Sequence, residues 1–120
     1  MHQLEAEFMF AAAHRLPRYQ GKCFNLHGHN YKLGVVLRGV PDAHTGIFVD
    51  FGDVEKAVKE QVLDLVDHTN LNDRIENPTA ENVATWCWNR LAGKIPGLVE
   101  VRLWEVATSV VAYRGPEGKF

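Results

Sequence analysis

The chain has 120 residues, of which 46% are hydrophobic and 23% charged, and its formal net charge is −2. The length corresponds to about one domain, residues 1–120, and the slightly acidic balance argues against nucleic acid as the main partner. No apolar run approaches the roughly 20 residues of a membrane span, and two cysteines are too few for a disulfide framework. Acidic residues stand near the N-terminus where a signal peptide would carry basic ones. We therefore expect a cytoplasmic protein with no nucleic-acid or membrane partner.

Two stretches near the N-terminus show the two-residue alternation of half-buried β-strands. Even positions are apolar in residues 4–12, and odd positions are apolar in residues 31–37. The histidines in phase with these apolar positions are His14, His27 and His29. They would point inward from two adjacent strands if the second strand extends back to residue 27 without a break. Gly28 leaves open a bulge that would interrupt it.

Helical periodicity follows a turn-rich segment at residues 39–50. Residues 53–66 place their apolar side chains on one helical stripe. A second helix is expected to open at Asn77-Pro78-Thr79, with Asn or Thr as its cap and proline favoured at its first position. Alternation returns in residues 99–103, and a last short strand is expected at residues 110–113. The order strand, strand, helix, helix, strand, strand predicts an α+β fold, with an antiparallel sheet covered on one face by two helices.

The histidines carry the clearest chemical signal. Two histidines two residues apart on a strand point to the same side and can bind one metal ion, and His14 would add the third nitrogen of a catalytic zinc site. Cys23 leaves two interpretations open. As a fourth ligand its thiolate would close the site and make it structural. Beside the metal it would be a thiol of lowered pKa, able to act as a base.

Two other features could contribute to a site. Glu105 is in phase with the apolar positions of its strand, where a carboxylate is costly unless it is paired. Either the strand end has reached solvent, or Glu105 anchors a ligand that offers paired N–H donors. Asp67 and His68 follow the first helix, and neighbours on a helix do not face each other. His68 is therefore either a helix-end residue favoured by the dipole or a group that polarises a partner with the help of Asp67.

Taken together, these residues resemble the 6-pyruvoyltetrahydropterin synthase and 6-carboxytetrahydropterin synthase family, over nearly the whole chain. Glu105 falls where the family keeps its pterin-anchoring glutamate, although Val106 follows it here and the family commonly has Thr. The segments similar to family motifs stand in the family's order: AAAHRL at 11–16, CFNLHGH at 23–29, HTG at 44–46, VDF at 49–51, DHTNLN at 67–72 and NPTAEN at 77–82.

The resemblance implies a tunnelling fold, in which subunits associate into a barrel and active sites lie at subunit interfaces. We expect a homo-oligomer, a hexamer, with Zn²⁺ as the cofactor. The site residues that the resemblance implies are His14, His27 and His29 for zinc, Cys23 as the proton-abstracting base, Asp67 and His68 as its catalytic support, Glu105 in catalysis and as pterin anchor, and Thr79 in substrate binding.

The spacing between Cys23 and His27 resembles one branch of the family. Three residues separate them, as in the bacterial carboxy-forming branch of queuosine biosynthesis, whereas the biopterin-forming branch has a longer gap. The implied activity is that of a lyase that converts 7,8-dihydroneopterin triphosphate to 6-carboxy-5,6,7,8-tetrahydropterin, acetaldehyde and triphosphate. The alternatives are a 6-pyruvoyltetrahydropterin synthase or promiscuous pterin synthase on the same site, and a non-catalytic structural zinc module.

Overall fold

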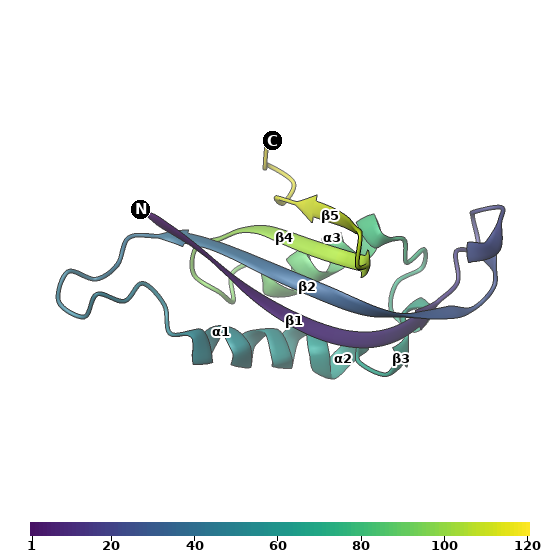
Figure 1. Ribbon diagram of the computed structural model, residues 1–120, viewed down its shortest axis with the longest axis horizontal. Coiled ribbons are helices and arrows are strands. Elements are labelled where there is room, and N and C mark those ends of the chain that lie inside the picture. The colour runs from purple at the N-terminus through teal and green to yellow at the C-terminus, as the bar shows by residue number, and fades with distance from the viewer.

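The computed structural model describes residues 1–120, and its core is a five-stranded sheet with the strand order β3-β1-β2-β4-β5 (Figure 1). Four strands pair antiparallel: β1 (His2–His14), β2 (His27–Gly39), β4 (Leu98–Val106) and β5 (Ser109–Tyr113). The sheet is mixed, because the two-residue strand β3 (Thr69–Asn70) pairs parallel with β1. The predicted α+β fold is confirmed, with β3 as an addition that is too short to give a periodic signal.

The hairpin of β1 and β2 keeps one register along its whole length. It runs from the pair His2 and Gly39 to the pair His14 and His27 without a shift. Gly28 pairs regularly with Ala13, so the bulge that this glycine left open is absent. The pleat therefore continues back to residue 27, and side chains at both ends of the turn keep their alternation.

The first helical segment is continuous but changes its winding. It consists of α1 (Phe51–Val58), a π-helical stretch (Lys59–Leu63) and α2 (Asp64–Val66). It begins two residues before the predicted Asp53, because the Asp50 side chain accepts a hydrogen bond from Gly52 N at 2.7 Å and caps it. A valine at every fourth position would drift around a regular helix, and the wider π turn counteracts this drift. The buried valines are Val54, Val58, Val62 and Val66.

The second helix, α3 (Ala80–Leu91), begins at a threonine cap. Thr79 Oγ1 accepts from Asn82 N at 3.1 Å. Pro78 therefore precedes the cap, and its expected place in the first helical turn is wrong. Two short 3-10 turns complete the list of helical elements, η1 (Lys22–Phe24) and η3 (Leu71–Asp73).

Both long helices cover the same face of the sheet, as the sequence predicts. One cluster of 19 buried apolar residues joins the valines of the first helix, the inner side of α3 and the inward positions of β1, β2 and β4. The hairpin reaches beyond this layer at both ends, where the 15–26 and 40–50 loops project (Figure 1). The three candidate ligands lie at the end that carries the 15–26 loop. No helix has both the length and the apolar character needed to cross a membrane.

Candidate metal centre and active site

The hairpin register brings the three histidines together. His14 pairs directly with His27, and His29 pairs with Ala12, two positions away on the same face. One ring nitrogen of each imidazole lies within 4.8 Å of the other two. The Nε2 atoms of His14 and His27 are 3.1 Å apart, close to the roughly 3.3 Å edge of a tetrahedron with metal–nitrogen bonds of about 2.0 Å. These three residues can hold a metal ion, as their sequence positions predict.

Backbone carbonyls orient two of the imidazoles. His14 Nδ1 donates to the Pro78 carbonyl at 2.8 Å, and His27 Nδ1 donates to the Asn25 carbonyl at 2.7 Å. A carbonyl oxygen only accepts, so each Nδ1 carries a hydrogen, and in the neutral form of the ring the Nε2 atom is then the one with a lone pair for a metal. Such partners fix the orientation of metal-binding histidines and raise their basicity. The buried hydroxyl of Tyr31 lies 3.2 Å from His14 Nδ1 and adds a second contact at that atom.

His29 completes the donor set. Its Nε2 atom is buried and has no hydrogen-bond partner in the protein. Burial lowers the pKa of His29, and nearby His14 and His27 lower it further, whereas Glu105 opposes them. A neutral imidazole with an unpaired, inward-facing nitrogen is the state that binds a metal. The three histidines therefore fit a metal ion on their own chemistry.

Cys23 is not part of this group. It sits in η1 within the 15–26 loop, where it is half-buried and forms no disulfide. The metal-binding group contains only the three histidines, and the thiol is not among its mutually close atoms. The loop is fastened by a backbone hydrogen bond from Leu16 N to Cys23 O at 2.7 Å. In this structure the thiol is therefore not positioned as a fourth ligand of the histidine group.

Glu105 does face the histidines. Its Oε1 atom lies 3.3 Å from His14 Nε2 and 4.0 Å from His29 Nε2, and its side chain is 28% exposed. The strand end is thus partly open to solvent, and the carboxylate nevertheless has partners there. Neither interpretation of the sequence included a partner within the chain, and here two imidazoles are its partners. The same carboxylate adds to the effect of burial in raising the pKa of the Tyr31 hydroxyl.

Asp67 and His68 contact each other, and the pair lies beside Ala11 of β1. Asp67 Oδ1 accepts from Ala11 N at 2.9 Å and lies 3.1 Å from His68 Nδ1. The helix ends at Val66, and His68 takes a left-handed backbone with φ of 62°, so the objection that neighbours on a helix do not face each other does not apply. The hydrogen bond from Ala11, together with His68, holds the pKa of the Asp67 carboxyl below its usual value.

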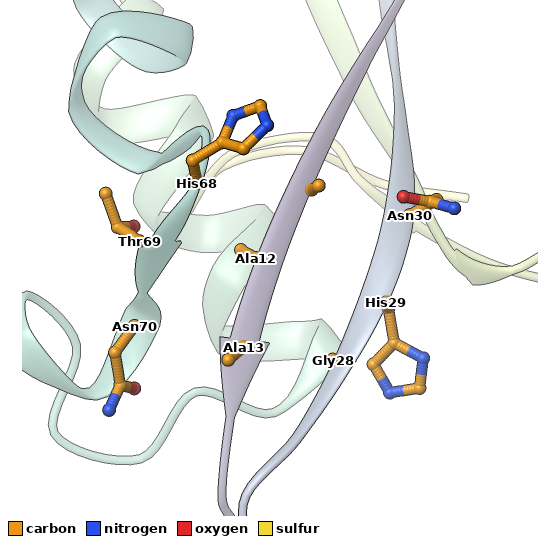
Figure 2. A pocket seen from close by; sticks show the side chains of 9 residues that line it. Ala12, Ala13, Gly28, His29, Asn30, His68, Thr69 and Asn70 are labelled. Atoms are coloured by element: carbon orange, nitrogen blue, oxygen red, sulfur yellow. The ribbon is translucent and has the colours of Figure 1, made fainter.

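The Asp67–His68 pair is separated from the histidine group within one chain. The His68 imidazole is 81% exposed. It lies on the β3 side of β1, whereas His29 projects from the far side of β2 (Figure 2). A pocket of about 550 Å³ spans these strand ends and is lined by both His68 and His29. His14 and His27 do not line it, so the pocket lies beside the metal centre and not over it.

Thr79 is placed by its capping role. Its hydroxyl oxygen accepts from Asn82 N, which leaves its hydrogen free to donate. The preceding carbonyl, that of Pro78, contacts His14. The supports missed by sequence reasoning are the carbonyls of Pro78 and Asn25 and the Tyr31 hydroxyl. Carbonyls leave no trace in side-chain identity, while Tyr31 could have been found from its position in phase with His27 and His29.

Known proteins resemble this chain over most of its length. The family model described as 6-pyruvoyl tetrahydropterin synthase matches residues 3–116. The chain belongs to this family. Its expected tunnelling fold is confirmed by the structure of 6-pyruvoyl tetrahydropterin synthase from Caenorhabditis elegans, with a TM-score of 0.87, 33% identity and 95% of each chain covered. The chain is thus a pterin synthase of this family, with three histidines arranged to bind a metal ion.

The similar relatives carry two different activity names. The 6-carboxy-5,6,7,8-tetrahydropterin synthase of Synechocystis sp. is 37% identical over 118 residues, which cover 92% of this chain and 91% of that protein. The 6-pyruvoyl tetrahydrobiopterin synthase of Dictyostelium discoideum is 32% identical over 123 residues, which cover 89% of this chain and 91% of that protein. The family is therefore clear from these relatives, whereas the choice of product needs further argument.

Proposed function

We propose that this chain is a zinc-dependent 6-carboxytetrahydropterin synthase. It would convert 7,8-dihydroneopterin triphosphate and one water to 6-carboxy-5,6,7,8-tetrahydropterin, acetaldehyde and triphosphate. Such a lyase would act in the cytoplasm, in queuosine and 7-deazapurine biosynthesis. The observation that carries the proposal is the convergence of three imidazole nitrogens, two of them on rings oriented by carbonyls, in a member of this family.

Zinc is the metal that suits this donor set. Three histidine nitrogens with an open fourth position form the ligand set of catalytic zinc sites, whereas four protein ligands form the structural ones. When bound at these histidines, zinc would act as a Lewis acid that acidifies the carbon next to the substrate's side-chain oxygens. The position of Cys23 outside the histidine group supports an open site. It disfavours the alternative of a closed structural zinc module.

The remaining residues would divide the proton and binding chemistry. The Cys23 thiolate would remove the side-chain proton, because the 15–26 loop holds it next to the strand that carries His27 and His29. His68, oriented by Asp67, would deliver or accept a proton on the other side of the substrate. Glu105 would hold the pterin ring through the ring's amino group and neighbouring N–H. Thr79 would donate a hydrogen bond to the substrate from the helix entry.

The proposed assembly is a homohexamer with active sites between subunits. Two strand edges are available for pairing between copies: β5 pairs only with β4, and β1 pairs with β3 at just two residues, Ala12 and Ala13. Unpaired edges readily recruit further strands. The exposed Asp67–His68 pair, which does not reach the histidine group of its own chain, would serve the metal centre of a neighbouring copy. Zinc would then be the only partner besides the pterin triphosphate and other copies of the chain.

The product distinguishes the main proposal from its closest rival. The three-residue gap between Cys23 and His27 supports the carboxy-forming reaction, as does the similarity to the Synechocystis protein. A 6-pyruvoyl-type synthase would keep all three side-chain carbons on the pterin and release no acetaldehyde. The test is mass spectrometry of the products that the zinc-loaded protein makes from dihydroneopterin triphosphate. Acetaldehyde and a carboxypterin are expected, and a pterin that retains three side-chain carbons would instead establish the rival.

A further inference from the structure

Glu105 places its carboxylate against two of the three histidines. Its Oε1 atom is 3.3 Å from His14 Nε2 and 4.0 Å from His29 Nε2. Ligand atoms that share one tetrahedral zinc ion, with bonds of about 2.0–2.2 Å, lie roughly 3.3–3.6 Å apart. The first distance is within this range, and the second exceeds it by a few tenths of an ångström. Glu105 is not among the atoms that all lie within 4.8 Å of one another. Its side chain therefore has to rotate to bring the carboxylate onto an ion held by the three imidazoles.

The backbone at Glu105 is shaped to aim this side chain. The pairing of β4 with β5 shifts register between Trp104 and Val106, so Glu105 is the extra residue of a bulge. Bulges bend a strand and re-aim a side chain, and they occur next to active sites. Buried Leu103, on the same face of β4, packs in the core, whereas Glu105 turns its carboxylate toward His14.

We propose that Glu105 is the fourth metal ligand in the substrate-free protein, and that a pterin ring releases it. The release step rests on the proposed function, in which Glu105 binds the ring. The Glu105 carboxylate cannot bind the metal and accept from both N–H groups of the pterin ring at full strength. Binding of the ring therefore withdraws the carboxylate from the metal. A coordination position then opens at the moment when the side chain of the substrate arrives.

Charge and desolvation make this exchange reasonable. Three neutral imidazoles leave both charges of a divalent ion uncompensated, and Glu105 is the carboxylate that faces them. A half-buried anion needs a charged or hydrogen-bonding partner. The metal supplies that partner in the free protein, and the paired N–H groups of a pterin supply it in the complex. The metal would thus stay four-coordinate until a ligand with the right ring edge binds.

Cobalt(II) substitution can detect the ligand directly, because its visible spectrum responds to the number and charge of its ligands. The samples are the cobalt-loaded parent protein, Glu105→Gln and Glu105→Ala, with Glu7→Gln as a matched control. Glu7 is an exposed carboxylate in the same sheet and lies 3.5 Å from Lys32, away from the histidines. We expect both Glu105 variants to shift the cobalt bands and to weaken zinc binding by roughly tenfold or more, since even indirect supports of a metal site contribute 10–100-fold. Glu7→Gln should match the parent.

Adding 6-methylpterin tests the release step. This probe carries the ring's N–H donors but no side-chain hydroxyl that could itself bind the metal. It should shift the cobalt spectrum of the parent toward that of Glu105→Ala and leave the spectrum of Glu105→Ala unchanged. Parent-like spectra and zinc affinity in both Glu105 variants would overturn the ligation. A Glu105-dependent spectrum in a protein that binds no pterin would leave the ligation standing, while it would overturn the release step and the proposed substrate class together.

Discussion

The histidines at the end of the β1–β2 hairpin and the histidine at the end of the first helical segment lie in contrasting surroundings. His14 is fully buried and its Nδ1 atom is held by a carbonyl, as is that of His27. His68 is 81% exposed, has a left-handed backbone, and contacts Asp67 through its imidazole. The imidazoles at the end of the hairpin are thus held in place by contacts within their own chain. The imidazole of His68 points outward into solvent.

This difference separates two parts of the proposed chemistry. A metal site needs ligands fixed to within a few tenths of an ångström, and the regular ladder of a hairpin provides that precision. A proton donor has to reach the substrate from another direction, and the exposed pair at the edge of β1 is free to meet a second copy of the chain. The strained backbone at His68 is typical of residues held for a function. The comparison therefore predicts different losses when each region is altered.

The largest effect is expected at the histidine group. His29→Ala removes one of the three histidine ligands, so the metal content should fall from about one zinc per chain to nearly none, and turnover should be abolished. Elemental analysis of the purified protein and the product assay measure these two quantities. His44→Ala, in the exposed 40–50 loop, is the matched control and should keep both. Full activity in a metal-free His29→Ala protein would refute the assignment of the site.

The next effect in size is expected at Cys23, beside the histidine group. Cys23→Ala should keep its zinc and its fold while its turnover falls by about 10²–10⁴-fold, the usual contribution of a positioned acid or base. Zinc content and circular dichroism, measured on the same sample as the rate, separate the two roles of the thiol. Loss of zinc in this variant would make Cys23 a ligand and the site a closed one.

Mixed oligomers test whether the two regions act across subunits. His29→Ala and His68→Ala are each expected to be inactive, and their co-expression with different tags should restore roughly a quarter of the parent activity if each site combines two randomly mixed chains. Cys23→Ala mixed with His29→Ala is the control. In the proposed site Cys23 and His29 come from the same chain, so no mixed site would contain both residues. This mixture should therefore restore no activity. Inactive mixed oligomers in the first experiment would place the complete site within one chain.

The sequence predicts the histidine group because two simple regularities determine it. The two-residue period of a strand fixes the face of each side chain, and the hairpin register sets His14 opposite His27. The helices follow from the spacing of their apolar residues in the same way. These features depend on which side chains stand at regularly spaced positions, and a single sequence shows that directly.

The remaining details depend on backbone placement, which the sequence does not display. The carbonyls of Pro78 and Asn25 orient imidazoles, but a carbonyl is present at every residue. The contact of Glu105 with the histidines depends on a bulge in β4, whose position is set by pairing with β5. The left-handed backbone of His68 arises where the helix ends against the edge of β1. Tertiary packing decides all three.

The smallest effect is expected at Thr79, where capping and substrate binding can be separated. Thr79→Ala removes the oxygen that accepts from Asn82 N and should lower the free energy of unfolding by about 1 kcal/mol.

Thr79→Asn restores a capping oxygen of equal or better quality, so its stability should return to that of the parent. It does not restore a hydroxyl donor. Because the Thr79 O–H is free to donate to a substrate, we expect Thr79→Asn to bind a pterin triphosphate more weakly by about 0.5–1.5 kcal/mol. Denaturant unfolding and ligand titration measure the two quantities. Parent-like affinity in a stable Thr79→Asn protein would make Thr79 a helix cap alone.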